Sequence, residues 1–281
     1  MRTFTAQTAD PVAICEELLN GAGAVKLTGL FAAEQIAEAR RIILEESDRD
    51  AGKVAHFQGA AAADGRFDLQ RRVWNLLAKG DVFAEMAAHP VLMGILRRWL
   101  GSEFIMGSIA ANRLLPGGPG QEPHVDYPYW DFHKPETHPM GLNASFPMNA
   151  QVTIVLDPFT AASGATAYLP GSQTHLRYPN EEEAAAFFQT CSRMEAEPGD
   201  TVLFFGAVWH CAMPNQSDHN RSAVLTNYLP KWVKPLEDMP VALPPGFVEA
   251  ASDDLRQLLG LNYPYPENLD QAAAENAEGR A

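Results

Sequence analysis

The pattern of apolar and polar positions divides the chain into a helical first part and a β-rich second part. Asp10 followed by Pro11 is the order of a helix N-cap and a first helical position, and Gly21 ends the periodic run that follows. Residues 24–30 form a short apolar run typical of a strand, and residues 32–50 repeat apolar positions at helical spacing. We therefore expect a helix, a strand and a longer helix at the start of the chain.

The next segments continue the helical part after an interruption. Residues 51–66 have no period and many small side chains, which is typical of a loop. Residues 68–101 predict two or three helices, with breaks near Gly80 and Pro90.

After residue 100, runs of β-branched and aromatic residues replace the helical period. Glycine, proline, asparagine or aspartate bounds each of these runs. The runs are residues 104–118, 149–157, 164–171, 200–210 and 222–230. Between them, only residues 181–188 predict a helix, so repeated β-α-β units are not expected. The spacing favours an antiparallel sandwich or barrel.

The domain organisation predicted from this pattern is a single domain over residues 1–281, because no linker-like stretch separates its parts. We expect a helical part over about 1–100, a β core over about 101–235, and a C-terminal extension over about 236–281. The last fifteen or so residues of that extension are polar and alanine-rich, and we expect them to be frayed.

Charge and cysteine content narrow the function classes. The formal net charge is −14, which repels phosphate backbones and anionic lipid, so we expect neither nucleic acid nor membrane partners. A polyanion such as a coenzyme A thioester would need a local basic patch. Cys15, Cys191 and Cys211 form no Cys-x-x-Cys pair, and the chain shows neither a signal-peptide pattern nor a long apolar run. These features favour a cytoplasmic location; the oligomeric state stays open.

Candidate chemistry begins at His124 and Asp126, in the stretch HVD. Alternate residues of an extended segment point to the same side, so this pair can chelate a metal ion. A non-haem iron site needs a second histidine on the same face, from another strand. The candidates are His56, His89, His133, His138, His175, His210 and His219.

His210 differs from the other candidates because it ends the β run of residues 200–210. Arg221 opens the following run, and a hairpin would bring its strand back beside the His210 strand. An arginine that enters a β core needs an anion. Asp200, Asp218 or the carboxylate of a cosubstrate could supply it.

Together these motifs resemble the phytanoyl-CoA dioxygenase family. The motifs are HVD, a distal WH with an arginine beyond it, and GATAYLPGSQTH at residues 164–175. The opening GAGAVKLTGLFAAEQIAEAR is similar to the family's first strand and helix. The resemblance covers roughly residues 10–235 and implies a mostly β fold, a double-stranded β-helix (jelly-roll, cupin-like) core with α-helices packed on one sheet.

The resemblance also implies site residues and cofactors. Fe(II), 2-oxoglutarate and O2 would be used, with His124, Asp126 and His210 as iron ligands and Arg221 on the far carboxylate of 2-oxoglutarate. Gln121, Thr166 and Asn112 match further positions near the cosubstrate. Two departures concern only these secondary contacts: Ala212 stands where some relatives have serine, and PGSQTH replaces the more usual Pro-Gly-Ser-His.

The implied reaction is hydroxylation, or a related oxidation, of an unactivated C–H bond in a small organic molecule, with release of succinate and CO2. Halogenating relatives replace the ligand carboxylate by a small residue, whereas Asp126 is present here. Tyr127, Trp130 and Phe146 are candidate substrate contacts, and residues 51–66 and 127–149 are candidate lids. Two alternatives remain: a cupin-like metal-binding isomerase, and a non-catalytic metal- or ligand-binding relative.

Overall fold

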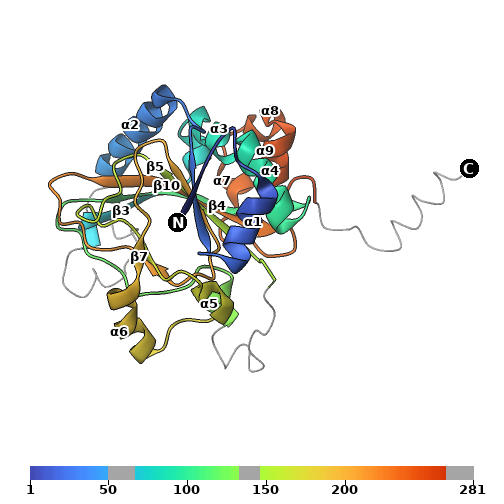
Figure 1. Ribbon diagram of the computed structural model, residues 1–281. Coiled ribbons are helices and arrows are strands. Elements are labelled where there is room, and N and C mark those ends of the chain that lie inside the picture. The colour runs from blue at the N-terminus through green and yellow to red at the C-terminus, as the bar shows by residue number, and fades with distance from the viewer. Residues whose placement is uncertain (50–66, 133–145, 264–281) are drawn as a thin grey trace, which may run out of the picture.

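The computed structural model of the chain describes residues 1–49, 67–132 and 146–263, and its strands form two sheets (Figure 1). The larger sheet has seven strands in the order β1-β2-β8-β5-β10-β4-β3. In that order they are Arg2–Thr5, Ala24–Thr28, Thr201–Phe204, Ala150–Val155, Arg221–Pro230, Phe104–Leu114 and Gln70–Val73. The smaller sheet comprises β7 (Ser192–Arg193), β6 (Ala167–Tyr168) and β9 (His210–Cys211).

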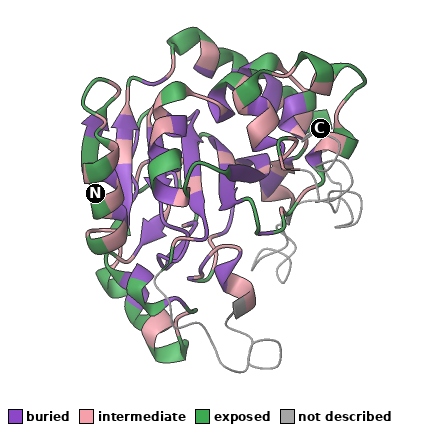
Figure 2. Ribbon diagram, turned by 90° about the vertical axis from the view of Figure 1, so that its right-hand side faces the viewer, coloured by how far each residue is buried: buried purple, intermediate pink, exposed green. Residues whose placement is uncertain are grey.

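Helices cover one face of the larger sheet, and buried residues concentrate on the strands beneath them (Figure 2). The longer helices are α1 (Pro11–Asn20), α2 (Ala33–Arg49), α3 (Asp81–Ala87), α4 (Pro90–Leu100) and α6 (Glu181–Thr190). The shorter ones are α5 (Tyr129–Phe132), α7 (Met239–Ala242), α8 (Phe247–Ala250), α9 (Asp253–Leu258), and the 3-10 turns η2 (Phe67–Leu69), η3 (Leu76–Ala78) and η4 (Ser172–His175). Helix α4 packs on the central strands β4, β5 and β10. This arrangement confirms the jelly-roll core with helices on one sheet.

Local signals account for the helix starts. The Asp10 side chain accepts a hydrogen bond from the Val12 amide at 3.0 Å, and Pro11 occupies the first helical position of α1. At α6, Asn180 and Glu183 form a capping box in which each side chain accepts from the other's backbone amide. Both helices were expected from the sequence and are confirmed.

The helical prediction for residues 68–101 is wrong at its start. Gln70–Val73 is strand β3, which pairs antiparallel with β4 so that Arg72 lies opposite Asn112. Its straight-chain residues favour a helix by propensity alone, but the edge of β4 offers backbone partners and a buried face. Strands β1 and β2 also come from the part of the chain expected to be mainly helical.

The run of residues 200–210 is not one strand. It leaves the larger sheet after Phe204 and rejoins the smaller sheet at His210. At the crossing, the Gly206 amide donates to Asn149 Oδ1 at 3.0 Å, and a Cβ on Gly206 would lie 2.2 Å from Asn149 Nδ2. The predicted pairing of the Arg221 strand with the His210 strand is therefore also wrong, since β10 pairs with β4 and β5 and β9 pairs with β6.

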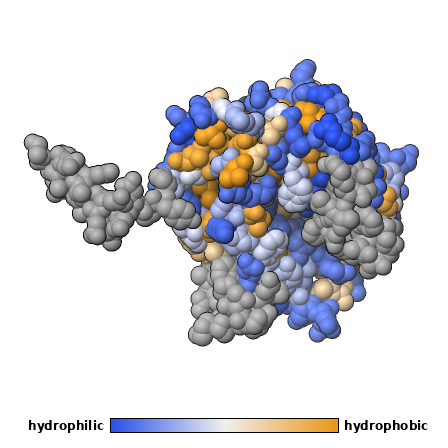
Figure 3. All heavy atoms as spheres, turned by 180° about the vertical axis from the view of Figure 1, so that it is seen from behind, coloured by the Kyte–Doolittle hydropathy of each residue, from blue (hydrophilic) through white to orange (hydrophobic). Residues whose placement is uncertain are grey.

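The outer surface mixes charged and apolar side chains. Apolar groups gather in patches among hydrophilic ones on the face shown in Figure 3. Large exposed apolar residues include Trp74, Phe146, Trp232 and Leu236, of which Trp74 and Leu236 also line a cavity described below. Among the described helices, none is long and apolar enough to cross a lipid bilayer.

Candidate metal centre

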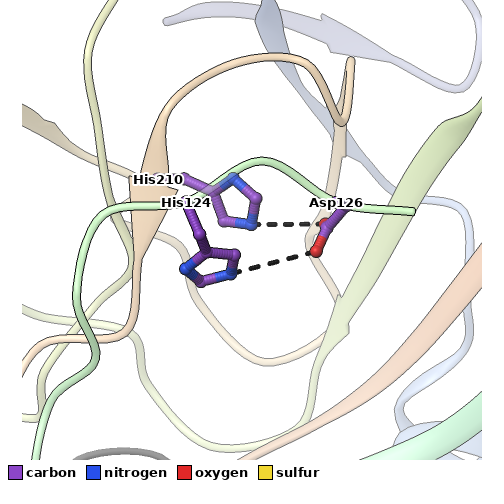
Figure 4. Close-up of side chains that lie close together, drawn as sticks. All are labelled: His124, Asp126 and His210. Carbon is purple, nitrogen blue, oxygen red and sulfur yellow. Dashed lines mark ion pairs between the residues drawn. The ribbon is translucent and has the colours of Figure 1, made fainter. Parts of the chain in front are cut away.

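Backbone pairing brings the two histidines of the candidate centre together. The His124 amide donates to the His210 carbonyl at 3.0 Å, and the His210 amide donates back to the His124 carbonyl at 3.0 Å. The Asp126 amide donates to the Gly206 carbonyl at 2.7 Å. The loop after β4 is thus tied at two points to the segment between the sheets, and the three side chains converge (Figure 4).

The distances within this triad suit a metal ion. Asp126 Oδ1 lies 3.9 Å from His124 Nε2, and Asp126 Oδ2 lies 3.3 Å from His210 Nε2. One potential ligand atom from each residue lies within 4.8 Å of the others. Two imidazoles and one carboxylate on one face are the donor set of many non-haem Fe(II) sites, so the residues present fit that ion.

The backbone orients both imidazole rings. His124 Nδ1 lies 2.8 Å from the Glu122 carbonyl, and His210 Nδ1 lies 2.8 Å from the Val208 carbonyl. A carbonyl only accepts, so each Nδ1 carries a proton and each Nε2 faces Asp126. Both rings therefore present the same nitrogen to the centre.

Electrostatics favours the ligand forms of His124 and Asp126. Burial lowers the pKa of His124 to about 4, and His210 adds to the effect. Burial alone would raise the pKa of Asp126, but His210 outweighs it and holds this pKa below the ordinary value. For His210, burial is outweighed by the Asp126 carboxylate, which raises the pKa. An ionised carboxylate and a neutral imidazole are what a cation binds.

The other histidine candidates do not join the triad within the described residues. His89 caps α4, His175 stacks on Trp209 at 4.6 Å between ring centroids, and His219 lies 3.2 Å from Asp218. Three further candidates, His56, His133 and His138, lie outside the described residues. Cys211 is buried beside His210, and burial raises the pKa of its thiol. We therefore interpret Cys211 as a packing residue and not as a metal ligand.

A small cavity of about 110 Å³ adjoins the triad and contains Arg221. The Arg221 side chain is buried, donates to the Gly164 carbonyl and lies over the Phe159 ring at 4.9 Å. Its Nε finds no hydrogen-bond partner, and no carboxylate of the described residues forms an ion pair with it. Burial, with Arg72 as a second cause, lowers its pKa to about 10. This cavity is therefore prepared for an anion.

Asp200 and Asp218, the two protein carboxylates that could have paired with Arg221, form ion pairs with other residues. Asp200 lies 3.7 Å from Lys26, and Asp218 pairs with His219. Of the three partners that the sequence suggests for Arg221, this leaves the carboxylate of a small molecule.

The three further residues named for the cosubstrate all line the small cavity. Gln121 accepts from the Ala212 amide through Oε1 at 3.0 Å, which leaves its Nε2 as a donor. Asn112 is buried and its Oδ1 has no hydrogen-bond partner within the described residues. Thr166 directly precedes β6.

Strand β3 adds two residues that the sequence reading missed. Gln70 and Arg72 line the small cavity, while Arg71 points away and pairs with Asp48 at 2.7 Å. The buried Gln70 Nε2 has no hydrogen-bond partner within the described residues. The sequence does contain a signal for them, since Gln70 and Arg72 are two positions apart, as residues on one face of a strand are. The helix-favouring composition of the surrounding segment obscured this signal.

A second, larger cavity of about 650 Å³ also adjoins the triad, at His124 and Asp126. Tyr127 and Trp130, named from the sequence, line it; their ring centroids lie 5.7 Å apart. Phe146, by contrast, is 55% exposed and stacks on Trp232, outside the described lining of both cavities. Of the two lids predicted from the sequence, residues 51–66 and most of residues 127–149 lie outside the described residues.

Comparison with known families places this site in context. A profile of the family described as phytanoyl-CoA dioxygenase (PhyH) matches residues 19–223. The chain is similar to Dioxygenase af480 of Aspergillus fumigatus, at 25% identity over 195 residues that cover 68% of this chain and 59% of that protein. It is also similar to Dioxygenase cdmA of Talaromyces verruculosus, at 26% identity over 188 residues, 64% of this chain and 58% of that protein. The chain thus spans less than two thirds of the length of these curated relatives.

Solved structures with a similar fold include SnoN, described as a non-haem α-ketoglutarate-dependent epimerase from nogalamycin biosynthesis. Its complex with Fe3+, α-ketoglutarate and nogalamycin RO superposes with a TM-score of 0.58 at 18% identity, covering 88% of this chain and 94% of that chain. At this identity the likeness concerns the fold, and it confirms the jelly-roll architecture.

Proposed function

The chain belongs to the phytanoyl-CoA dioxygenase family, and from that premise we propose that it is an Fe(II)- and 2-oxoglutarate-dependent oxygenase that hydroxylates a small organic molecule. The C–H bond attacked is unactivated, and succinate and CO2 are the coproducts. The relatives named as dioxygenases support the general class. The hydroxylation and the roles of individual residues are our proposal.

One observation carries this proposal: a two-histidine, one-carboxylate triad faces the same small cavity as a buried arginine that has no carboxylate partner among the described residues. A cupin-like isomerase has no need for the arginine. In an oxygenase of this class, both features have a use. The triad would bind the metal ion, and the arginine would bind the far carboxylate of the cosubstrate.

Each residue then has a role in binding. His124, Asp126 and His210 would hold the iron, and Arg221 would pair with the far carboxylate of 2-oxoglutarate. When bound, iron with 2-oxoglutarate and O2 supplies the oxidising power that an unactivated C–H bond requires. Gln70, Asn112 and Thr166 line the same cavity and would surround the cosubstrate there.

The intact carboxylate favours hydroxylation over halogenation, since Asp126 occupies the position that a halide would need. SnoN, described as an epimerase, is an example of another outcome on this fold. Mass spectrometry of the product separates them: hydroxylation adds one oxygen atom, desaturation removes two hydrogens, and epimerisation leaves the mass unchanged.

The first test is cosubstrate binding without oxygen. Addition of Fe(II) and then 2-oxoglutarate to the full chain should produce the weak visible charge-transfer band of an iron-bound 2-oxo acid. His210→Ala should abolish the band, Arg221→Ala should demand far more 2-oxoglutarate, and His219→Ala should match wild type. Iron binding without the band, at saturating 2-oxoglutarate, would favour the cupin-like alternative.

A further inference from the structure

The larger cavity differs from the small one in the sign of its own charged residues. Arg72 lines both cavities and lies at their junction beside the triad. The charged residues that line only the larger cavity are Glu122 and Glu237, and both are acidic. Glu122 is exposed, whereas Glu237 is partly buried. Glu237 is therefore the inner charged group that a ligand's distal end would meet.

A β-bulge positions Glu237. The pairing of β4 with β10 shifts register at Gly107, so that Asn227 faces Ser108 while Tyr228 faces Met106. The Gly107 carbonyl accepts from the Leu236 amide at 2.9 Å and from the Glu237 amide at 3.3 Å. Bulges are over-represented next to active sites, where they re-aim neighbouring groups. Here the bulge holds the segment after β10 against the sheet.

A second contact fixes the same segment from the metal side. Tyr127, one residue after the ligand Asp126, donates through its hydroxyl to the Lys234 carbonyl at 2.6 Å. The segment of residues 234–237 is thus held at both ends, and Glu237 forms part of the cavity wall.

One oxygen of the Glu237 carboxyl group is not satisfied. Its Oε1 is buried and has no hydrogen-bond partner within the described part of the chain. Burial raises the pKa of this carboxyl group to about 7, although the Ile109 amide and Arg72 act in the opposite direction. A buried carboxylate oxygen without a hydrogen-bond partner is costly, and a cationic ligand that donates to Oε1 would remove that cost.

Aromatic side chains form the rest of the wall. Trp74, Tyr127, Trp130 and Tyr178 line the larger cavity together with the aliphatic Leu225 and Leu236. Aromatic faces bind ammonium groups as well as apolar carbon, because the ring quadrupole is negative on its face. A cavity whose lining combines a carboxylate with aromatic rings suits an organic cation.

We propose that the larger cavity takes a small organic amine as substrate, with Glu237 pairing with the protonated nitrogen and the aromatic rings covering the apolar body. This inference rests on the proposed function, since it names the substrate class of the same site. Glu237 is a specificity-determining residue in this scheme and takes no part in metal or cosubstrate binding.

Three probes that share one apolar body test the proposal: 3-phenylpropylamine, 3-phenylpropan-1-ol and 3-phenylpropanoate. Each is titrated calorimetrically into the full chain carrying Mn(II) and 2-oxoglutarate. We expect the amine to bind about tenfold or more tighter than the alcohol, as a hydrogen bond to a charged group implies. Glu237→Gln should bring this ratio close to one while leaving the alcohol's affinity unchanged.

Asp238→Asn is the matched control, because it removes the same charge from an exposed neighbour that does not line the described cavity. It should keep the wild-type ratio. Tighter binding of the carboxylate or the alcohol, a preference that survives Glu237→Gln, or no binding of the amine at millimolar concentration would overturn the proposal.

The design separates this inference from the proposed function. The titration of 2-oxoglutarate into the Mn(II)-loaded chain precedes the probes and uses the small cavity. If 2-oxoglutarate does not bind, the proposed function fails. If 2-oxoglutarate binds and the amine preference is absent, only the substrate class is wrong.

Discussion

The two cavities that meet at the metal triad are built in different ways. Four neighbouring strands contribute most of the small cavity, through Gln70 and Arg72 of β3, Asn112 of β4, Thr153 of β5 and Arg221 of β10. The larger cavity draws Tyr127, Trp130, Tyr178, Leu236 and Glu237 from connections between strands. From the sheet, the larger cavity is also lined by Arg72 of β3, Ser108 and Ala110 of β4, Gln151 of β5, and Leu225 and Asn227 of β10.

Because of this difference, amino-acid changes are tolerated to a different extent in the linings of the two cavities. Side chains on paired strands are held by the sheet register: Arg72 lies opposite Asn112, and Asn112 lies opposite Ala223. Residues on connections can change without disturbing that register. On the proposed function, we expect the paired strands to fix the cosubstrate cavity, while the connections select the substrate.

The largest expected effect comes from the triad, because it borders both cavities. His210→Ala should weaken divalent metal binding by more than about 100-fold, since even the loss of an outer-shell partner costs 10–100-fold. Calorimetry with Mn(II) measures the affinity. His219→Ala, at an exposed histidine paired with Asp218, is the control. Equal metal affinity in both variants would show that the triad is not the metal site.

Arg221→Ala should weaken ligand binding in the small cavity and leave the metal site and the larger cavity unchanged. Loss of one partner of a buried charge pair costs about 2–5 kcal/mol, so the dissociation constant of 2-oxoglutarate should rise at least about thirtyfold. Metal affinity should stay near the wild-type value. Arg221→Lys should recover part of the binding, because a single ammonium replaces the planar guanidinium fork.

The control for this substitution is Arg41→Ala, at an exposed arginine that pairs with Glu38 and Glu45 on α2. Its 2-oxoglutarate affinity should equal that of wild type. If Arg221→Ala also leaves that affinity unchanged, Arg221 has a structural role and the cosubstrate lies elsewhere.

Gly107→Ala should act on the larger cavity through the bulge. A Cβ there would lie 2.3 Å from Asn227 Oδ1 and 2.5 Å from Leu229 Cδ1, so neighbouring groups must move. We expect the free energy of unfolding to fall by about 1–3 kcal/mol in denaturant titrations. The amine-to-alcohol ratio should fall as well, because the Gly107 carbonyl holds the Glu237 segment.

A second glycine serves as the control that separates the effect of a steric clash from the effect of replacing glycine by alanine. Gly94 lies inside α4, and a Cβ there would meet nothing within 4 Å. Gly94→Ala should leave the probe ratio unchanged and raise stability by up to about 1 kcal/mol through helix propensity. If Gly107→Ala is as harmless as Gly94→Ala, the bulge does not position Glu237.

The smallest expected effect is at Gln70. Gln70 lines the small cavity, its Nε2 has no hydrogen-bond partner among the described residues, and one such hydrogen bond contributes about 1 kcal/mol. Gln70→Leu should therefore weaken 2-oxoglutarate binding about fivefold and leave the amine probe unaffected. Gln216→Leu, at an exposed glutamine, should change neither affinity. A larger loss of amine than of 2-oxoglutarate binding would mean that the two cavities are not separate.

Much of the fold could be predicted where local signals are strong. The caps of α1 and α6 and the long periodic run of α2 appear in the structure as the sequence indicates. The prediction failed at β3, whose residues carry helix propensity. It also failed at the passage from β8 to β9, where an unbroken apolar run changes sheets. In both cases a partner distant in sequence, β4 for one and β6 for the other, decided the outcome.

By itself, the sequence determined the residue types and short-range spacing of the chemistry: His124 and Asp126 two positions apart, a later histidine, and an arginine beyond it. The tertiary structure alone decided what those residues meet. It placed His210 and Arg221 on different sheets, brought Gln70 and Arg72 into the small cavity, and set Glu237 in the wall of the larger one. The physical reason is that alternation along a strand is local, whereas strand pairing, bulges and crossings depend on backbone partners far away in the chain.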